Sequence, residues 1–251
     1  GHDDPRLVEM AKRSRSIWSD WGEQLGAELV SGDGVLALGE SSLDRLWILE
    51  RAGGVNAHRA GADEVAARMP ILAGYEGPAV LDEDGGAIRT SAAIARLSAE
   101  LGESLVADEV ISLRPTSAGV ELRSGVERSE FDAAIVCAGR GTAALARTLG
   151  LSLPIDLAAH VRLTFELNVA PPDRLACLQD SSGEFPETGV YAAPEPGNRR
   201  YAVGLSETVA GADGGAVVRS RGMRLGWERG STRSIPAKDA ARHTAYARWS
   251  L

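Results

Sequence analysis

The sequence predicts a mixed α/β or α+β fold, with a nucleotide-type layer and a second layer built on a mostly antiparallel sheet. Three observations support this prediction. Apolar residues recur at helical spacing from residue 5 to 26. A three-strand pattern over residues 107–139 includes an apolar run, 133–137, that reads as a buried strand. Two further strand-like stretches, 158–169 and 189–207, follow it.

Local signals predict four helices. Asp3 and Asp4 followed by Pro5 form a good helix start, and Gly26 ends the first helix. The other three are expected over residues 42–54, closed by Gly53 and Gly54; over 62–72, broken by Pro70; and over 91–102, capped by Thr90 or Ser91, with Ile94, Leu97 and Leu101 on one face.

Turn residues predict the strand pairs. Residues 27–41 read as a hairpin around the turn 31–34, and two short strands flank the turn 83–86. Another pair flanks residues 117–119. Cys177 lies in a stretch that reads as a loop.

The composition is that of an ordinary globular protein, with 44% hydrophobic and 25% charged residues among 251. The sequence shows neither a membrane-spanning apolar stretch nor a secretory signal. Two cysteines make no disulfide framework, and we expect a cytoplasmic protein. The four histidines, at positions 2, 58, 160 and 243, have no metal-ligand spacing, so we expect no metal.

Charge is distributed unevenly along the chain. The net charge of −8 argues against a nucleic-acid partner, and we expect no membrane partner either. Residues 219–251 carry eight Lys or Arg and two acids, which leaves 19 basic and 33 acidic residues in the first 218. We expect the basic tail, 211–251, to be poorly ordered or aberrant, as a frameshift or an unrelated splice would make it.

A glycine-rich turn follows the apolar run. Gly139, Gly141 and Ala144 spell G-x-G-x-x-A, the pattern of a dinucleotide-binding turn. Such a turn also needs a following parallel strand that ends in an acid about 20 residues on. Here Pro154 stands just before Asp156, and no buried strand ends there. The turn is therefore not expected to be the primary phosphate-binding element.

The stretch "DAAIVCAGRGTAALARTLGL" resembles the last strand and turn of the flavin domain in FAD-dependent amine oxidoreductases of the D-amino-acid oxidase, sarcosine oxidase and glycine oxidase superfamily. Further stretches are similar to this family in order and spacing, and together they extend from about residue 1 to 210. They are "GHDDPRLVEMAKRSRSIWSDWGEQLGAELVSGDGVLALGE", "ARMPIL", "DGGAIRTSAAIARLSAELG", "ADEVISLRPTSAGVELRSG" and "VYAAPEPGNRRYAVGLSE".

The resemblance implies a partial FAD-binding domain and a substrate domain. It assigns residues 1–75 to the helices and hairpin of the substrate domain and 76–150 to the FAD-binding domain. Residues 151–210 form the substrate-domain sheet, and the tail covers 211–251. In the FAD-binding part, the residues implied to contact the cofactor are Val110, Ala138, Gly139, Arg140 and Gly141.

The resemblance also assigns residues of this chain to the substrate pocket. Tyr191 falls where such enzymes place a pocket tyrosine, although a tyrosine in a strand also suits a core or rim position. Arg200 or its neighbour Arg199 would clamp a substrate carboxylate, although both also suit a solvent-facing turn. Ala202 stands where sarcosine-oxidase-like members carry an oxygen-activating lysine, and Ser206 stands at a histidine position. We therefore expect a dehydrogenase or a poor oxidase.

The sequence departs from the family at both ends. The family's first strand, G-x-G-x-x-G turn and helix have no counterpart here, so we expect a truncated member whose FAD binding is doubtful or is completed by another chain that supplies the missing unit. The predicted function is oxidation of the C–N bond of a small amine or amino acid by hydride transfer to FAD, giving an imine. The alternative is a non-catalytic fragment, or a module that binds a small molecule or a partner and holds no flavin.

Overall fold

A computed structural model describes residues 4–155, 158–159, 162–167, 170–182, 189–205 and 209–210. The chain divides into two compact units. Of the described residues, those within 4–97 and 159–209 belong to the first unit, and those within 98–158, together with residue 210, belong to the second. The predicted basic tail, 211–251, lies outside the described residues.

Helix α1 (Pro5–Leu25) forms as its local signals predict. The Asp4 carboxylate accepts a hydrogen bond from the Arg6 backbone N–H at 2.9 Å and so caps the first turn. Pro5 occupies the first helical position, where its missing N–H costs nothing. Gly26 ends the helix in the left-handed conformation at φ 59°, which residues other than glycine rarely adopt.

The remaining predicted helices are also present. They are α2 (Glu40–Ala52), which ends at Gly53; α3 (Ala62–Arg68), which the short 3-10 turn η1 (Pro70–Leu72) follows; and α4 (Thr90–Leu101), which continues into η2 (Gly102–Ser104). The predicted apolar face of α4 is largely exposed, with Ile94 67% and Leu101 53% accessible. Leu97 is half-buried.

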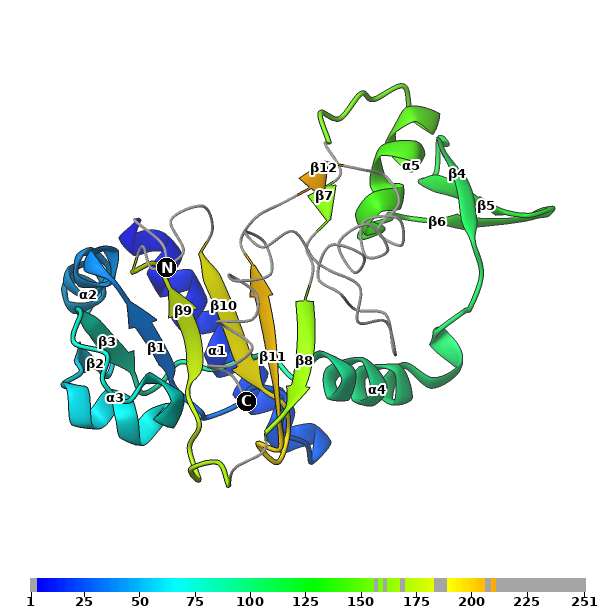
Figure 1. Ribbon diagram of the computed structural model, residues 1–251. Coiled ribbons are helices and arrows are strands. Elements are labelled where there is room, and N and C mark those ends of the chain that lie inside the picture. The colour runs from blue at the N-terminus through cyan, green and yellow to red at the C-terminus, as the bar shows by residue number, and fades with distance from the viewer. Residues whose placement is uncertain are drawn as a thin grey trace, which may run out of the picture. The chain divides into compact units, whose positions relative to one another are not determined.

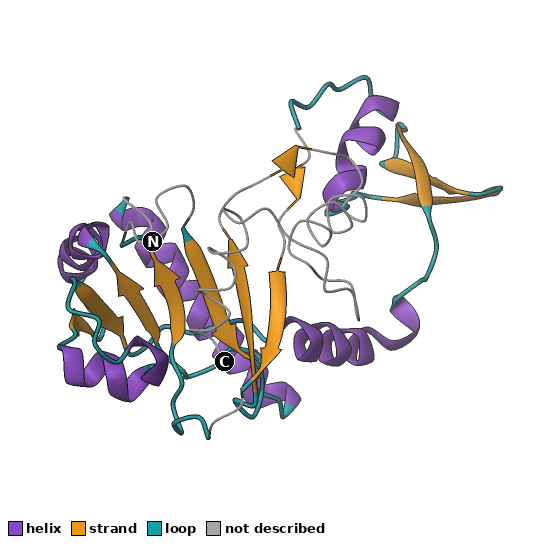
Figure 2. Cartoon of the chain, in the orientation of Figure 1, coloured by secondary structure: helices purple, strands orange, loops and turns teal. Residues whose placement is uncertain are grey.

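The first unit contains a seven-stranded sheet (Figures 1 and 2). All its neighbouring strands are antiparallel except β1 and β9, which run parallel. Its order is β2 (Ala57–Arg59), β3 (Ala79–Asp82), β1 (Val35–Leu38), β9 (Cys177–Asp180), β10 (Val190–Pro194), β11 (Arg200–Leu205) and β8 (Arg162–Glu166). This mostly antiparallel sheet confirms the predicted fold class.

Alternation along the strands separates two sheet faces. Val190 and Ala192 of β10 lie in the hydrophobic core beside Tyr201 and Val203 of β11. The core also receives side chains from β1, β3, β9, α3 and η1, including Leu36, Leu38, Leu81, Leu178, Val65, Met69 and Leu72. Tyr191 and Ala202 therefore point to the opposite face of the sheet, because neighbouring residues of a strand alternate in direction.

The second unit is a three-stranded meander of β4 (Val110–Pro115), β5 (Val120–Ser124) and β6 (Glu127–Phe131) with the short helix α5 (Thr142–Thr148). Leu113 of β4 and Ala146 of α5 are buried, whereas every residue of β6 is exposed. A further pair of two-residue strands, β7 (Ala158–Ala159) and β12 (Val209–Ala210), is also present.

Three sequence predictions about strands were wrong. Residues 27–41 form no hairpin: β1 pairs with β3 and β9, while Val30 bridges to Ile88. The run 133–137 is exposed rather than a buried strand, and no described strand pairs with it. Cys177 lies in a strand rather than a loop, because β9 pairs on both sides and buries it.

Candidate functional site

Tyr191 lies on a strand position that a glycine makes possible. It pairs with Gly204 of β11 on one side and with Gln179 of β9 on the other. A Cβ atom on Gly204 would lie 2.3 Å from Cζ of Tyr191 and 2.6 Å from its hydroxyl oxygen. The phenol ring therefore rests on the β11 backbone, where any larger residue would displace it. Sequence reasoning missed Gly204, because only the strand register identifies it.

Small residues continue the face that carries Tyr191. Ala193 of β10 pairs with Ala202 of β11, and both are buried. Ala202 also pairs with Thr164 of β8, which is exposed. The position assigned to an oxygen-activating lysine thus carries a methyl group opposite another methyl group. Ser206, at the assigned histidine position, lies outside the described residues.

Arg200 lies at the other end of β11. It has the same strand parity as Ala202 and Gly204, so it shares their face, whereas Arg199 precedes the strand. Four residues separate it from Gly204, which is about 13 Å at 3.3 Å per residue. Its guanidinium forms an ion pair with Glu195 in the β10–β11 turn and its side chain is 57% exposed. The substrate-clamp role of Arg200 stays a prediction.

The glycine-rich turn of the second unit is open to solvent. Gly139–Gly141 form a 3-10 turn (η3) that leads into α5, and the Gly141 N–H donates to the Ala138 carbonyl at 2.9 Å. Gly139 has φ 52°, and a Cβ placed on it would meet nothing within 4 Å. Arg140 is exposed, and no side chain caps the start of α5. Backbone groups of this turn are therefore accessible to a ligand.

Packing of α5 on β4 fixes the turn within its unit. The Leu113 N–H donates to Thr148 Oγ1 at 3.0 Å, at the C-terminal end of α5. Val110 begins β4, pairs with Ser124 and is half-buried. One small substructure thus holds all five residues that the resemblance assigned to the cofactor. An exposed glycine turn with free backbone approach fits part of a dinucleotide.

A buried arginine fixes the end of β10. Arg89 Nη1 donates to the Pro194 carbonyl at 2.6 Å, and its Nη2 donates to Asp33 Oδ2 at 2.9 Å. Its Nε donates to Glu28 at 3.1 Å. The Arg89 side chain is 7% exposed and that of Asp33 is 12% exposed. Because the Arg89 guanidinium is fully bonded to Asp33, Glu28 and the Pro194 carbonyl, it positions the strand that carries Tyr191. It is not a ligand site.

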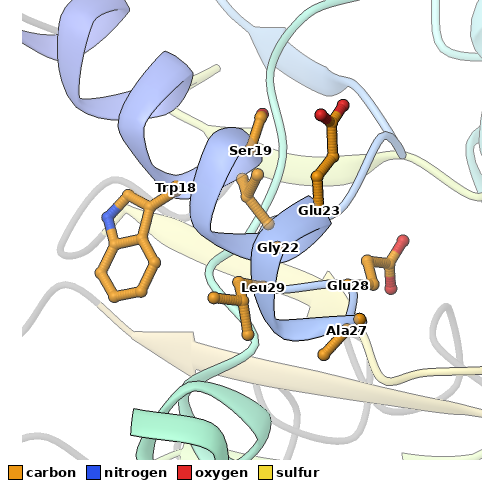
Figure 3. A pocket seen from close by; sticks show the side chains of 9 residues that line it. Trp18, Ser19, Gly22, Glu23, Ala27, Glu28 and Leu29 are labelled. Atoms are coloured by element: carbon orange, nitrogen blue, oxygen red, sulfur yellow. The ribbon is translucent and has the colours of Figure 1, made fainter. Parts of the chain in front are cut away.

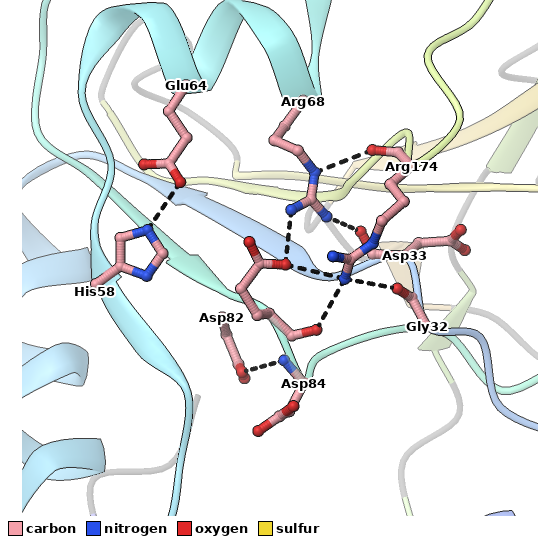
Figure 4. A network of polar contacts seen from close by, with 9 residues as sticks. Gly32, Asp33, His58, Glu64, Arg68, Asp82, Asp84 and Arg174 are labelled. Atoms are coloured by element: carbon pink, nitrogen blue, oxygen red, sulfur yellow. Dashed lines mark hydrogen bonds and ion pairs between the residues drawn. The ribbon is translucent and has the colours of Figure 1, made fainter.

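A second arginine network ties β9 to β3 (Figure 4). Arg68 Nη1 donates to Glu83 Oε2 at 2.8 Å and its Nε donates to the Arg174 carbonyl at 3.0 Å. Arg174 in turn lies 2.9 Å from the same Glu83 oxygen and donates to the Gly32 carbonyl at 3.0 Å. The hydrogen bond from Arg68 lowers the pKa of Glu83, while burial raises the pKa of the neighbouring Asp82. Local sequence carries no signal for this network.

A separate hollow of about 430 Å³ lies at the C-terminal end of α1 (Figure 3). The Trp18 ring and the Leu29 side chain face it, together with Gly22 and the backbone turn that follows the helix. None of the predicted site residues lines this hollow.

Possible metal ligands among the described residues are histidine, cysteine and acidic side chains. No group of three histidine, cysteine or acidic side chains there could hold a metal ion. His58, the one histidine among them, bonds Glu64 at 2.9 Å. His2, His160 and His243 lie outside the described part of the chain. Among the helices described, none has the length and hydropathy to cross a bilayer.

Comparison with known proteins identifies the family. The family model described as FAD dependent oxidoreductase (DAO) matches residues 1–247. The chain belongs to this family, whose members are FAD-dependent oxidoreductases. The predicted resemblance is thereby confirmed. No curated protein sequence matches the chain.

Solved structures share the fold at low sequence identity. Glycine oxidase from Geobacillus kaustophilus has a TM-score of 0.66 at 20% identity, and the match covers 82% of this chain and 57% of that one. L-proline dehydrogenase from P. horikoshii has a TM-score of 0.70 at 13% identity, and the match covers 98% of this chain and 62% of that one. Iminodiacetate oxidase from Chelativorans sp. BNC1 has a TM-score of 0.65 at 21% identity, and the match covers 88% of this chain and 64% of that one. The chain thus spans 57% to 64% of the length of these three structures.

Proposed function

We propose that the chain functions as part of an FAD-dependent oxidoreductase that oxidises the C–N bond of a small amine or amino acid. Family membership and the position of Tyr191 support the proposal. The single observation that carries it is the Tyr191 ring, which is half-buried on β10 and rests on the backbone of β11 at Gly204, so that its hydroxyl has a fixed position.

Each residue has a limited task in this proposal. The backbone of residues 138–141 would contact the dinucleotide, and Val110 would face its adenine. The Tyr191 hydroxyl would orient the substrate, and Arg200 would bind its carboxylate. The flavin, when bound, supplies the hydride acceptor. We propose dehydrogenase or slow oxidase activity, because Ala202 provides no ammonium group to promote the reaction with oxygen.

The first experiment is a visible absorption spectrum of the purified chain before and after incubation with FAD and desalting. Flavin bands that survive desalting support the proposal, and reduction of the bands by an amine under anaerobic conditions would identify the substrate. A chain that stays colourless contradicts flavin chemistry by this polypeptide alone and favours a module without flavin. Retention of FAD only with a second polypeptide that carries a G-x-G-x-x-G unit would show that another chain completes the site.

A matched pair of glycine variants tests the turn. Gly139 and Gly125 both have positive φ, 52° and 56°, and a Cβ at either position would meet nothing within 4 Å. Asp tolerates this conformation, so neither variant should unfold the unit. In Gly139→Asp the carboxylate would repel the phosphates of FAD, so we expect the Kd for FAD, measured by fluorescence titration, to rise about tenfold or more. Gly125→Asp should leave it unchanged; equal effects of both variants would contradict the assignment.

Ala202→Lys tests the alignment of β11. If position 202 faces the flavin, a lysine there should raise the rate at which oxygen reoxidises the reduced flavin in stopped-flow experiments. An unchanged rate in a variant with normal circular dichroism and normal FAD binding would count against this alignment.

A further inference from the structure

Helix α1 carries a second apolar stripe that its own chain leaves exposed. Val8 and Gly22 face the interior, whereas Leu7 is 41%, Met10 64%, Ile17 40% and Trp21 40% exposed. These four residues, with Ser14 between them, follow the alternating spacing of three and four that places side chains in one row along a helix. The row is distinct from the side of the helix that carries the buried Val8 and Gly22.

Charges on α1 are separated along its length. The first half carries Arg6, Lys12, Arg13 and Arg15 against one acid, Glu9, and the second half carries Asp20 and Glu23 with no basic residue. Arg13 and Asp20 are seven residues apart, so they lie on the same flank of the stripe. Neither forms an ion pair with another described residue, whereas Arg6 pairs with Asp4 and Lys12 with Glu9.

We propose that this stripe is a homodimer interface in which α1 packs antiparallel against α1 of a second copy. With the twofold axis between residues 15 and 16, Met10 faces Trp21 of the second copy and Ser14 faces Ile17 of the second copy. The same register brings Arg13 beside Asp20 of the second copy, twice per dimer. Ser14 is the small residue of the stripe, and it leaves room for the larger Ile17 of the second copy, so that the side chains of the two helices interdigitate there.

The second copy is the occupant because the face is complementary to itself. An isologous interface requires that residue i contact residue j and that j contact i. Reversal of α1 provides this, because the basic half of one helix then lies along the acidic half of the other. The proposed interface involves no contact with flavin. Dimerisation can therefore be tested independently of the proposed function.

Sedimentation velocity of the 251-residue chain over a range of concentrations tests the interface. We expect a concentration-dependent monomer–dimer equilibrium. Arg13→Asp alone, or Asp20→Arg alone, should raise the dimer dissociation constant about tenfold or more, because each creates two like-charge contacts. The double variant Arg13→Asp/Asp20→Arg should restore dimerisation, since both ion pairs re-form with reversed sign.

Two further variants distinguish this interface from association through a different surface of the chain. Met10→Glu should weaken the dimer, whereas Arg96→Asp, on exposed α4 surface, should not change it. All four altered positions are exposed, and circular dichroism checks that each variant is folded. A monomer at every concentration would overturn the proposal. A dimer that persists in Arg13→Asp or Asp20→Arg alone would also overturn it. So would a double variant that does not dimerise again.

Discussion

The two units of the chain are stabilised in different ways. In the first unit, the seven-stranded sheet packs on a core of large buried side chains, and two arginines with little solvent exposure join segments far apart in sequence. Arg89 and the Pro194 carbonyl are 105 residues apart, and Arg68 and the Arg174 carbonyl are 106 apart. In the second unit, Arg114 pairs with Glu121 only seven residues away, on the surface.

This difference has consequences for cooperativity. Contacts between distant segments form only when the whole unit is folded, so breaking one weakens the entire unit. The meander of β4, β5 and β6 pairs sequential strands and buries little apolar surface, so it can open locally. We therefore expect amide hydrogens of β9, β10 and β11 to exchange slowly and those of β5 and β6 to exchange quickly.

The largest effect is expected from Arg89→Ala. The variant leaves the carboxylate of Asp33, 12% exposed, without its buried partner, and it removes the donor to the Pro194 carbonyl. Loss of one member of a buried pair costs about 3–5 kcal/mol of unfolding free energy. Urea denaturation would measure it, with exposed Arg96→Ala as the matched control. A loss below about 1 kcal/mol would show that Arg89 does not tie the first unit together.

Leu113→Ala applies the same test to the second unit. Leu113 is 5% exposed and is one of two buried hydrophobic residues described there. Truncation should cost about 2–4 kcal/mol through lost burial and the cavity left behind. Hydrogen exchange should accelerate in β4, β5 and α5 alone. Acceleration of equal size in β10 and β11 would show that the two units unfold together, which would contradict local opening of the second unit.

Local signals predicted the helices of the first unit correctly. Asp4, Pro5 and Gly26 set the bounds of α1, and Gly53 ends α2. These signals act within one helical turn, so a sequence displays them fully. The resemblance to a family pointed to Tyr191 and to the turn 138–141, because those motifs are also contiguous.

The strand errors have a different origin. The four-residue strand β9 is too short for a visible alternation, and its parallel partner β1 lies about 140 residues earlier. The apolar run 133–137 predicted a buried strand, but a strand is buried only if neighbours pair with it. Gly204 and the partners of Arg68 and Arg89 are likewise defined by register and packing, which no local pattern encodes.

A smaller effect is expected from the pH dependence of the Arg68 network. The pKa of Glu83 lies below its ordinary value of 4.5, chiefly because Arg68 donates to its carboxylate. The ion pair thus stabilises the fold fully above pH 4.5, and this stability is lost as pH falls through the lowered pKa. Glu83→Gln should cost about 1 kcal/mol at pH 7. The difference from the parent should shrink below pH 4.5.

Both proteins must be compared in the same buffers, because burial raises the pKa of Asp82 and contributes a dependence of the opposite sign. Taking the difference between parent and Glu83→Gln removes that contribution. A difference that stays constant from pH 7 to pH 3 would contradict the role of the Glu83 carboxylate.

The smallest effect is expected from Arg114→Ala in the second unit. Its guanidinium bonds Glu121 at 3.0 and 3.1 Å, which makes it the best-formed ion pair of the meander. The side chain is nevertheless 65% exposed, so water solvates both charges when the pair is broken. The hydrogen bond from Arg114 lowers the pKa of Glu121, yet we expect no measurable change in urea stability. A clear loss would mean that the surface pairs of the second unit stabilise it as the buried arginines stabilise the first.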